Sequence, residues 1–77
     1  MEKSTVDWSP ILESKDDEGK ITIYGTEING KFYWISKQPD GKWCIETKGL
    51  TGDIYPLKIG LMSLSSAKRY FSRYIKP

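Results

Sequence analysis

The sequence contains no histidine and a single cysteine, Cys44. Histidine acid–base catalysis and histidine-containing zinc sites are therefore excluded, and one thiolate cannot build a cysteine cage around a metal. A single cysteine also precludes an internal disulfide, which favours a reducing compartment. We interpret Cys44 as a small strand residue, because no histidine is present to act as its base. The sequence predicts no catalytic residue, no metal site and no cofactor.

Long apolar runs are missing as well. Residues 1–7 have no apolar stretch of the signal-peptide type, and no segment is long enough to span a bilayer. We therefore expect a cytoplasmic protein with no membrane partner and no small-molecule substrate. Carboxylates are sparse after residue 19, and Glu27 and Glu46 are predicted to point to opposite faces of a sheet. A carboxylate pair for acid–base work is not expected, so the sequence predicts a non-enzyme.

Charge is unevenly distributed along the 77 residues. Residues 1–19 carry six acidic and two basic side chains, whereas residues 20–77 carry ten basic and four acidic ones. This asymmetry indicates an acidic tail on a basic body. We predict that residues 1–19 form an acidic, partly disordered leader and that residues 20–77 form one small domain with limited buried surface.

The leader contains one apolar segment. Trp8, Ile11 and Leu12 are too apolar for a free tail, and Ser9 and Pro10 could cap and begin a single helical turn. Two interpretations remain open. Either these residues cover part of the rim of the sheet, or they form a short motif that docks into a partner.

Three β-rich runs separated by two turn signals make up the centre of the chain. Asn29-Gly30 is the strongest two-residue hairpin signal, because a type I′ turn needs positive φ at both positions. Pro39-Asp40-Gly41 is a second turn signal. Pro56 confines a later extended run to a sheet edge. The predicted strands lie near residues 20–28, 31–37, 42–48 and 54–60.

A helix is predicted near residues 64–75, with Ser63 or Ser65 as its N-cap. Its apolar stripe consists of Leu64, Ala67, Phe71, Tyr74 and Ile75. Its opposite side is basic and includes Lys68, Arg69 and Arg73. This side either stabilises the helix end or contacts phosphates. The predicted fold class is α+β, an antiparallel β-meander of three or four strands backed by one C-terminal helix.

The two hairpins decide which side chains share a face. The first places Trp34 opposite Gly25, where the ring would cover the gap left by the missing side chain. The second has either a four-residue loop, which pairs Lys37 with Lys42, or a three-residue loop, which pairs Gln38 with Lys42. A change from one loop to the other moves every side chain of the third strand to the opposite face of the sheet. We favour the four-residue loop because it gathers the apolar residues on one face. That face would carry Ile21, Ile23, Gly25, Phe32, Trp34, Trp43 and Ile45, with Trp34 and Trp43 buried beside Phe71.

The other face would then be basic and aromatic. Its predicted binding residues are Lys31, Tyr33, Lys37, Lys42, Lys48 and Tyr24. Lys31 would stand opposite Lys48, and Lys37 opposite Lys42, in pairs that repel. An anion would relieve this repulsion, and lysines interleaved with aromatic rings are typical of nucleic-acid surfaces. The alternative is that these lysines only protect exposed strands from aggregation.

The order of three strands and a helix resembles the DNA-binding domains of plant ethylene-response factors and the arm-site-binding ends of phage tyrosine integrases. The similar residues are Gly41-Lys42-Trp43 with the alternation through Glu46, then Ile59-Gly60 and Met62, then residues 65–70. The resemblance implies a sheet that enters the DNA major groove with the helix behind it. The strand arginines that read bases in those families are lysines here.

A second class of function competes with DNA binding. Small sheet-plus-helix proteins with a single cysteine are common among phage and mobile-element accessory products. The alternative function is therefore an inhibitor of the anti-CRISPR or anti-restriction type, which binds a nucleic-acid-binding host protein complex. Its acidic leader and exposed aromatic residues would carry the binding, since interface hot spots favour Trp, Tyr and Arg.

Overall fold

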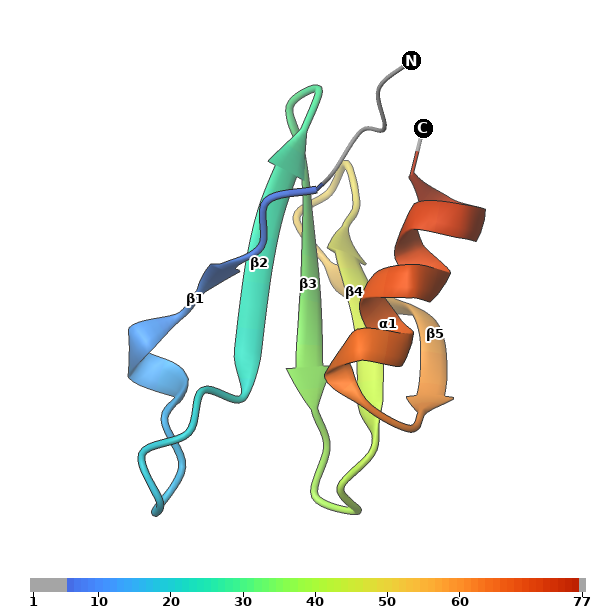
Figure 1. Cartoon of the computed structure of the whole chain (residues 1–77). Helices are drawn as coiled ribbons and strands as arrows, with labels where there is room; N and C mark the ends of the chain where they lie inside the picture. Colours follow the sequence, from blue (N-terminus) through green and yellow to red (C-terminus); the bar gives the residue numbers. More distant parts are fainter. Residues whose placement is uncertain (1–5, 77) are drawn as a thin grey trace.

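The computed structural model describes residues 6–76 and has an α+β fold. Within these residues, five strands form one open antiparallel sheet in sequence order (Figure 1). The strands are β1 (Ser9–Pro10), β2 (Ile23–Ile28), β3 (Lys31–Lys37), β4 (Trp43–Lys48) and β5 (Ile54–Leu61). A 3-10 turn, η1 (Leu12–Ser14), follows β1, and the helix α1 (Leu64–Tyr70) continues into a π-helix, η2 (Phe71–Ile75). The expected α+β meander is confirmed, but three or four strands is an undercount.

The missing strand is β1, which lies in the predicted leader. Ser9 pairs with Gly25 and Pro10 pairs with Tyr24, so no helical turn begins at these residues. The side chain of Ser14 secures the segment that follows. Its hydroxyl donates to the Ile11 carbonyl at 2.7 Å and accepts hydrogen bonds from two backbone N–H groups at the start of β2. The leader was expected to be partly disordered. Its residues 1–5 lie outside the described residues.

The first hairpin has the predicted register. Asn29 and Gly30 have φ values of 53° and 80°, as a type I′ turn requires. Ile28 pairs with Lys31, and Gly25 pairs with Trp34.

The second hairpin has the three-residue loop, so the predicted four-residue register is wrong. The N–H of Gln38 donates to the Lys42 carbonyl at 2.7 Å, and the N–H of Gly41 donates to the Gln38 carbonyl at 2.9 Å. Gly41 adopts a φ of 86°, which a residue with a side chain rarely takes. Oδ1 of Asp40 accepts a further hydrogen bond, from the N–H of Lys42 at 2.9 Å. This loop chemistry determines the register of β4.

The register reverses the predicted faces of β4, and the helix packs on the side that was expected to be open. Lys37 pairs with Trp43, and Ile35 pairs with Ile45. The core on the helix side consists of Tyr33, Ile35, Ile45, Leu61, Ala67 and Phe71. Trp43 packs partly against this core, as predicted, whereas Trp34 lies on the opposite face. The prediction that Trp34 is buried beside Phe71 is therefore wrong.

The helix begins at the expected cap and changes its winding near its end. The hydroxyl of Ser63 accepts a hydrogen bond from the N–H of Ser66 at 3.0 Å. The N–H of Lys76 donates to the Phe71 carbonyl at 2.8 Å, a π-type bond over five residues. This wider turn takes Tyr74 out of the predicted apolar stripe, and its side chain is 66% exposed. Within the described residues, no helix is both long and apolar enough to cross a membrane.

Among the described residues β5 is one of the two edge strands of the sheet, and its features oppose further strand pairing. Gly49 donates its N–H to the Asp53 carbonyl. Because hydrogen-bonded and non-hydrogen-bonded pairs alternate along an antiparallel ladder, the backbone nitrogen of Pro56 points away from β4. Its missing N–H therefore costs no bond with β4 and weakens the edge as a template. Two register shifts between β4 and β5 distort the edge further.

Candidate binding site on the open face of the sheet

The helix covers one side of the sheet, as Figure 1 shows, and leaves the other side uncovered. We call this uncovered side the open face. Strand alternation and the observed registers assign its residues. They are Ile23, Gly25 and Glu27 of β2, Phe32, Trp34 and Ser36 of β3, Lys42 with Cys44, Glu46 and Lys48 along β4, and Ile54 and Pro56 of β5.

A pair of aromatic rings occupies the centre of the open face. The rings of Phe32 and Trp34 are stacked, with centroids 6.1 Å apart and planes at 19°. Trp34 lies over Gly25, where an added β-carbon would be 3.1 Å from Cδ1 of the indole, and Ile11 lies beside it. Phe32 is 45% exposed. The strand glycine therefore lets the indole lie down on the sheet and supports a rigid, partly exposed aromatic surface.

The charges on the open face are balanced. Glu27 pairs with Phe32, and Glu46 pairs with Trp34, so one carboxylate stands beside each ring. Lys42 and Lys48 lie at the two ends of the β4 run. Two glutamates and two lysines thus flank the aromatic pair, and the face has no predominant sign.

The predicted lysine face does not form. Lys31 and Lys37 lie on the helix side of β3, whereas Lys42 and Lys48 lie on the open face, because the three-residue loop shifts β4 by one residue. Since Lys37 pairs with Trp43, the predicted opposition of Lys37 to Lys42 is wrong, and the same shift removes that of Lys31 to Lys48.

The two predicted tyrosines are also unavailable as stacking surfaces. Tyr33 is only 5% exposed, and its ring meets Phe71 edge-on at 4.8 Å. Tyr24 is half-buried on the helix side, 6.4 Å from the ring of Trp43. The ammonium group of Lys68 lies 5.6 Å from the centroid of Tyr24 on the same side. Both rings therefore serve packing between sheet and helix.

The structure does bring the predicted basic residues of the helix together. Lys68, Arg69 and Arg73 line one shallow hollow of about 440 Å³ with Ser72. Two of the three contact rings, since Lys68 lies over Tyr24 and the Arg73 guanidinium lies 5.8 Å from the Tyr74 centroid. These contacts are consistent with a packing role and leave a phosphate-binding role as a prediction.

The apolar leader residues divide between packing and exposure. Trp8 meets Phe71 edge-on with ring centroids 5.0 Å apart, and it packs against the core. Ile11 contacts the region of Gly25 and Trp34. Leu12 is 64% exposed. Trp8 thus covers the sheet, as the first of the two interpretations expected, and partner docking by Ile11 and Leu12 stays a prediction.

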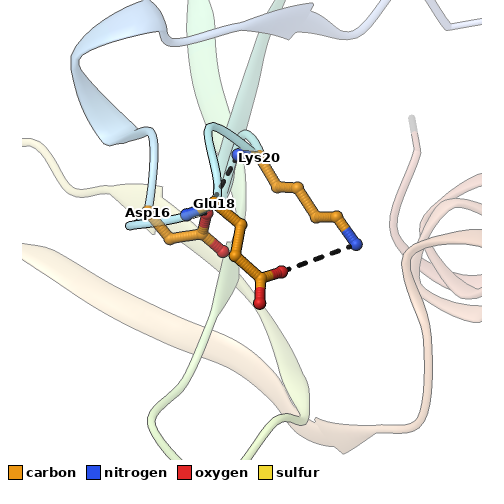
Figure 2. A network of polar contacts seen from close by, with 3 residues as sticks. All are labelled: Asp16, Glu18 and Lys20. Carbon is orange, nitrogen blue, oxygen red and sulfur yellow. Dashed lines mark hydrogen bonds and ion pairs between the residues drawn. The ribbon is translucent and has the colours of Figure 1, made fainter.

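The acidic end of the leader forms a tight turn, shown in Figure 2. Oδ1 of Asp16 accepts hydrogen bonds from the N–H groups of Glu18 and Lys20, each at 2.9 Å. Glu18 and Lys20 form an exposed ion pair at 3.8 Å. The hydrogen bond from Lys20 is the main cause that lowers the pKa of Asp16 below its ordinary value of 3.8. This part of the predicted acidic leader is therefore a hydrogen-bonded turn.

Cys44 is buried on the open face and is not activated. The side-chain amide of Gln38 donates to its Sγ at 3.1 Å. Burial, followed by the nearby charge of Glu46, raises the pKa of the thiol. A raised pKa opposes thiolate formation. Within residues 6–76, no group of three or more His, Cys, Asp or Glu side chains is placed to hold a metal ion.

Comparison of the chain with protein-family models, curated proteins and solved structures found no match. The open face must therefore be interpreted from its own chemistry. Phe32 and Trp34, its central pair, were assigned to the core from the sequence. No local signal would have placed them correctly, because Pro39-Asp40-Gly41 is compatible with both loop lengths.

Proposed function

We propose that this protein is a non-enzymatic binding module that docks another protein through the open face of its sheet. The observation that carries the proposal is the stacked and partly exposed Phe32–Trp34 pair on a face that the helix does not cover. Aromatic anchors surrounded by polar groups are typical of the centre of a protein interface. Trp34 is held against Gly25 before binding, so little side-chain entropy remains to be lost.

The charge pattern favours a protein partner over a DNA duplex on this face. A surface that follows phosphates needs basic groups of one sign. Here Glu27 and Glu46 pair with the two aromatic residues, and they would repel a phosphate backbone that approached the rings. A protein surface can instead offer both signs, with a basic group for each glutamate and an acidic group for Lys42 and Lys48.

A narrower form of the proposal is an inhibitor of a host complex that binds nucleic acid. The acidic segment at residues 13–18 supports it, because such an inhibitor acts by occupying a surface that binds nucleic acid. The expected cytoplasmic location and a nucleic-acid-binding host protein as partner belong to this narrower proposal.

The experiment places a photo-crosslinking amino acid at position 32 and, as a matched control, at position 74. Both side chains are exposed, at 45% and 66%, but they lie on opposite sides of the sheet. In native host cells, position 32 should give a discrete heteromeric product that position 74 does not give. The captured protein, once purified, should bind the wild-type chain directly.

The reconstituted complex then tests the chemistry. Phe32→Ala should weaken binding by at least tenfold, as expected for an interface hot spot, whereas Tyr74→Ala should leave it unchanged. Affinity should change little with salt, in contrast to the loss of about 10³–10⁵ for six to ten phosphate contacts between 50 and 200 mM salt. Absence of a protein product from position 32, or equal protein products from both positions, would contradict the proposal.

A further inference from the structure

A second recessed surface lies at one end of the sheet, where the β2–β3 turn meets the loop between β4 and β5 (upper end in Figure 1). It is an open hollow of about 600 Å³. This volume is within the range of about 300–1,000 Å³ that is usual for small-molecule sites. The residues that line it include Lys31, Phe32, Lys48 and Tyr55, together with Leu50 and glycines of the two loops.

Two lysines and no acidic residue are among the residues that line this hollow. Lys31 comes from the start of β3 and Lys48 from the end of β4, so two different strands bring them to the same place. Both side chains are exposed, and within the described residues neither forms an ion pair. The nearby acid Asp53 accepts a hydrogen bond from the Thr51 hydroxyl at 3.1 Å and does not line the hollow. An anion bound in the hollow would gain charge-assisted hydrogen bonds from these lysines.

The opposite end of the sheet provides a contrast. Lys37 lies close enough to Asp16 to contribute to its lowered pKa. Lys42 lines a different hollow that includes Asp40. The hollow at that end therefore includes an acidic residue, whereas the residues that line the Lys31–Lys48 hollow include none.

Two partly exposed rings at the same hollow narrow the class of anion. Phe32 and Tyr55 are 45% and 43% exposed, and Tyr55 lies over Gly49, where an added β-carbon would be 3.2 Å from Cε1 of the tyrosine. A free phosphate or a carboxylate would use the lysines and leave both rings in water. A nucleoside phosphate would use both kinds of side chain, with its phosphate near the lysines and its base near the rings. Bases stack on aromatic rings in this way in proteins that bind single-stranded nucleic acid.

We propose that this hollow binds a nucleoside phosphate, with the phosphate between Lys31 and Lys48 and the base against Phe32 or Tyr55. The ligand is either a free nucleotide or one unit of a single strand. The site shares Phe32 and Lys48 with the protein-docking surface and differs from it by Lys31 and Tyr55, whereas Trp34 does not line it.

The test measures fluorescence anisotropy of a labelled ten-residue oligothymidylate at low salt, with thymidine monophosphate and inorganic polyphosphate as competitors. Lys31→Gln with Lys48→Gln should weaken binding and reduce the salt slope by about 0.7 for each lost phosphate contact. The matched control is Lys37→Gln with Lys42→Gln, which removes the same charge at the other end of the sheet and should leave the affinity nearly unchanged. Thermal melting of both double variants verifies that they are folded.

The stacking part is tested without a change of charge. Tyr55→Leu and Phe32→Leu are compared with the wild type, and at least one should lose about fivefold to a hundredfold in affinity for the oligonucleotide. Competition by the monophosphate identifies a free nucleotide as sufficient, whereas competition by an oligonucleotide alone identifies a single strand; either supports the site. Absence of binding at low salt, equal competition by polyphosphate, or equal loss in the two double-lysine variants would overturn it. Trp34→Ala should not alter oligonucleotide binding, so this test can fail independently of the protein-docking proposal.

Discussion

Trp34 lies directly over Gly25, its partner across β2 and β3, so closely that a β-carbon on the glycine would be 3.1 Å from Cδ1 of the indole. We therefore expect Gly25→Ala to displace the ring and to lower the free energy of unfolding by about 1 kcal/mol, as overpacking does. Urea denaturation measures the loss. With Trp34→Leu already present, the same change should be neutral or stabilising, because alanine loses less backbone entropy than glycine in a strand. An equal loss in both backgrounds would exclude the contact.

The register of the second hairpin makes a chemical prediction. Ser36 stands directly opposite Cys44. The Cα atoms of a hydrogen-bonded pair in an antiparallel ladder are about 5.5 Å apart, which is within the range of a disulfide. Ser36→Cys should therefore form an intramolecular disulfide under mild oxidation, detected as a mass loss of about 2 Da and the absence of free thiol. Lys37→Cys is the matched control, because its side chain points to the other face. In the four-residue register Ile35 would stand opposite Cys44, so a disulfide formed by Ile35→Cys and not by Ser36→Cys would support that loop.

The sequence was sufficient for features that depend on local chemistry. Asn29 and Gly30 defined the first turn and with it the pairing of Gly25 with Trp34, because both residues tolerate positive φ. The helix followed in the same way from apolar spacing, and of the two predicted caps, Ser63 and Ser65, the structure has Ser63. In these places each residue determines its own backbone conformation, and no distant contact is needed.

The second register depended on a choice that local chemistry left open. Pro39-Asp40-Gly41 is compatible with both loop lengths, and large apolar residues occupy both faces of the sheet, with Trp43 on one and Trp34 on the other. The apolar partition was therefore a poor guide, and the candidate site moved with it. Strand β1 was not predicted either, because two residues carry no periodic pattern and their pairing relies on Ser14 bonding to β2.

The turn in Figure 2 predicts a pH dependence. Hydrogen bonds from the backbone of Lys20 and Glu18 lower the pKa of Asp16, so the carboxylate form is favoured in the folded chain. A lowered folded-state pKa contributes stability above the unfolded value, and this contribution is lost as the pH falls through the folded value. NMR titration should place Asp16 below 3.8.

Asp16→Asn should correspondingly reduce the acid dependence of stability, whereas Asp17→Asn, one position along the same turn, should leave it unchanged. Equal effects of the two substitutions on the acid limb would show that net charge, and not the Asp16 hydrogen bonds, is responsible.

The last prediction concerns the contact between Trp8 and Phe71, which joins the leader to the core. The two rings meet edge-on at 5.0 Å, and Phe71 is fully buried. Phe71→Ala should cost about 3–5 kcal/mol, and Trp8→Ala should cost less because Trp8 is only half-buried. Leu12→Ala, at a position in the same segment that is 64% exposed, should stay within about 0.5 kcal/mol of the wild type. Combining Trp8→Ala with Phe71→Leu, which keeps the chain folded, should reveal a coupling of about 0.5–1.5 kcal/mol in urea denaturation, as aromatic pairs show. Strict additivity of the two changes would mean that Trp8 does not pack on the core in solution, and the leader would then be free to act elsewhere.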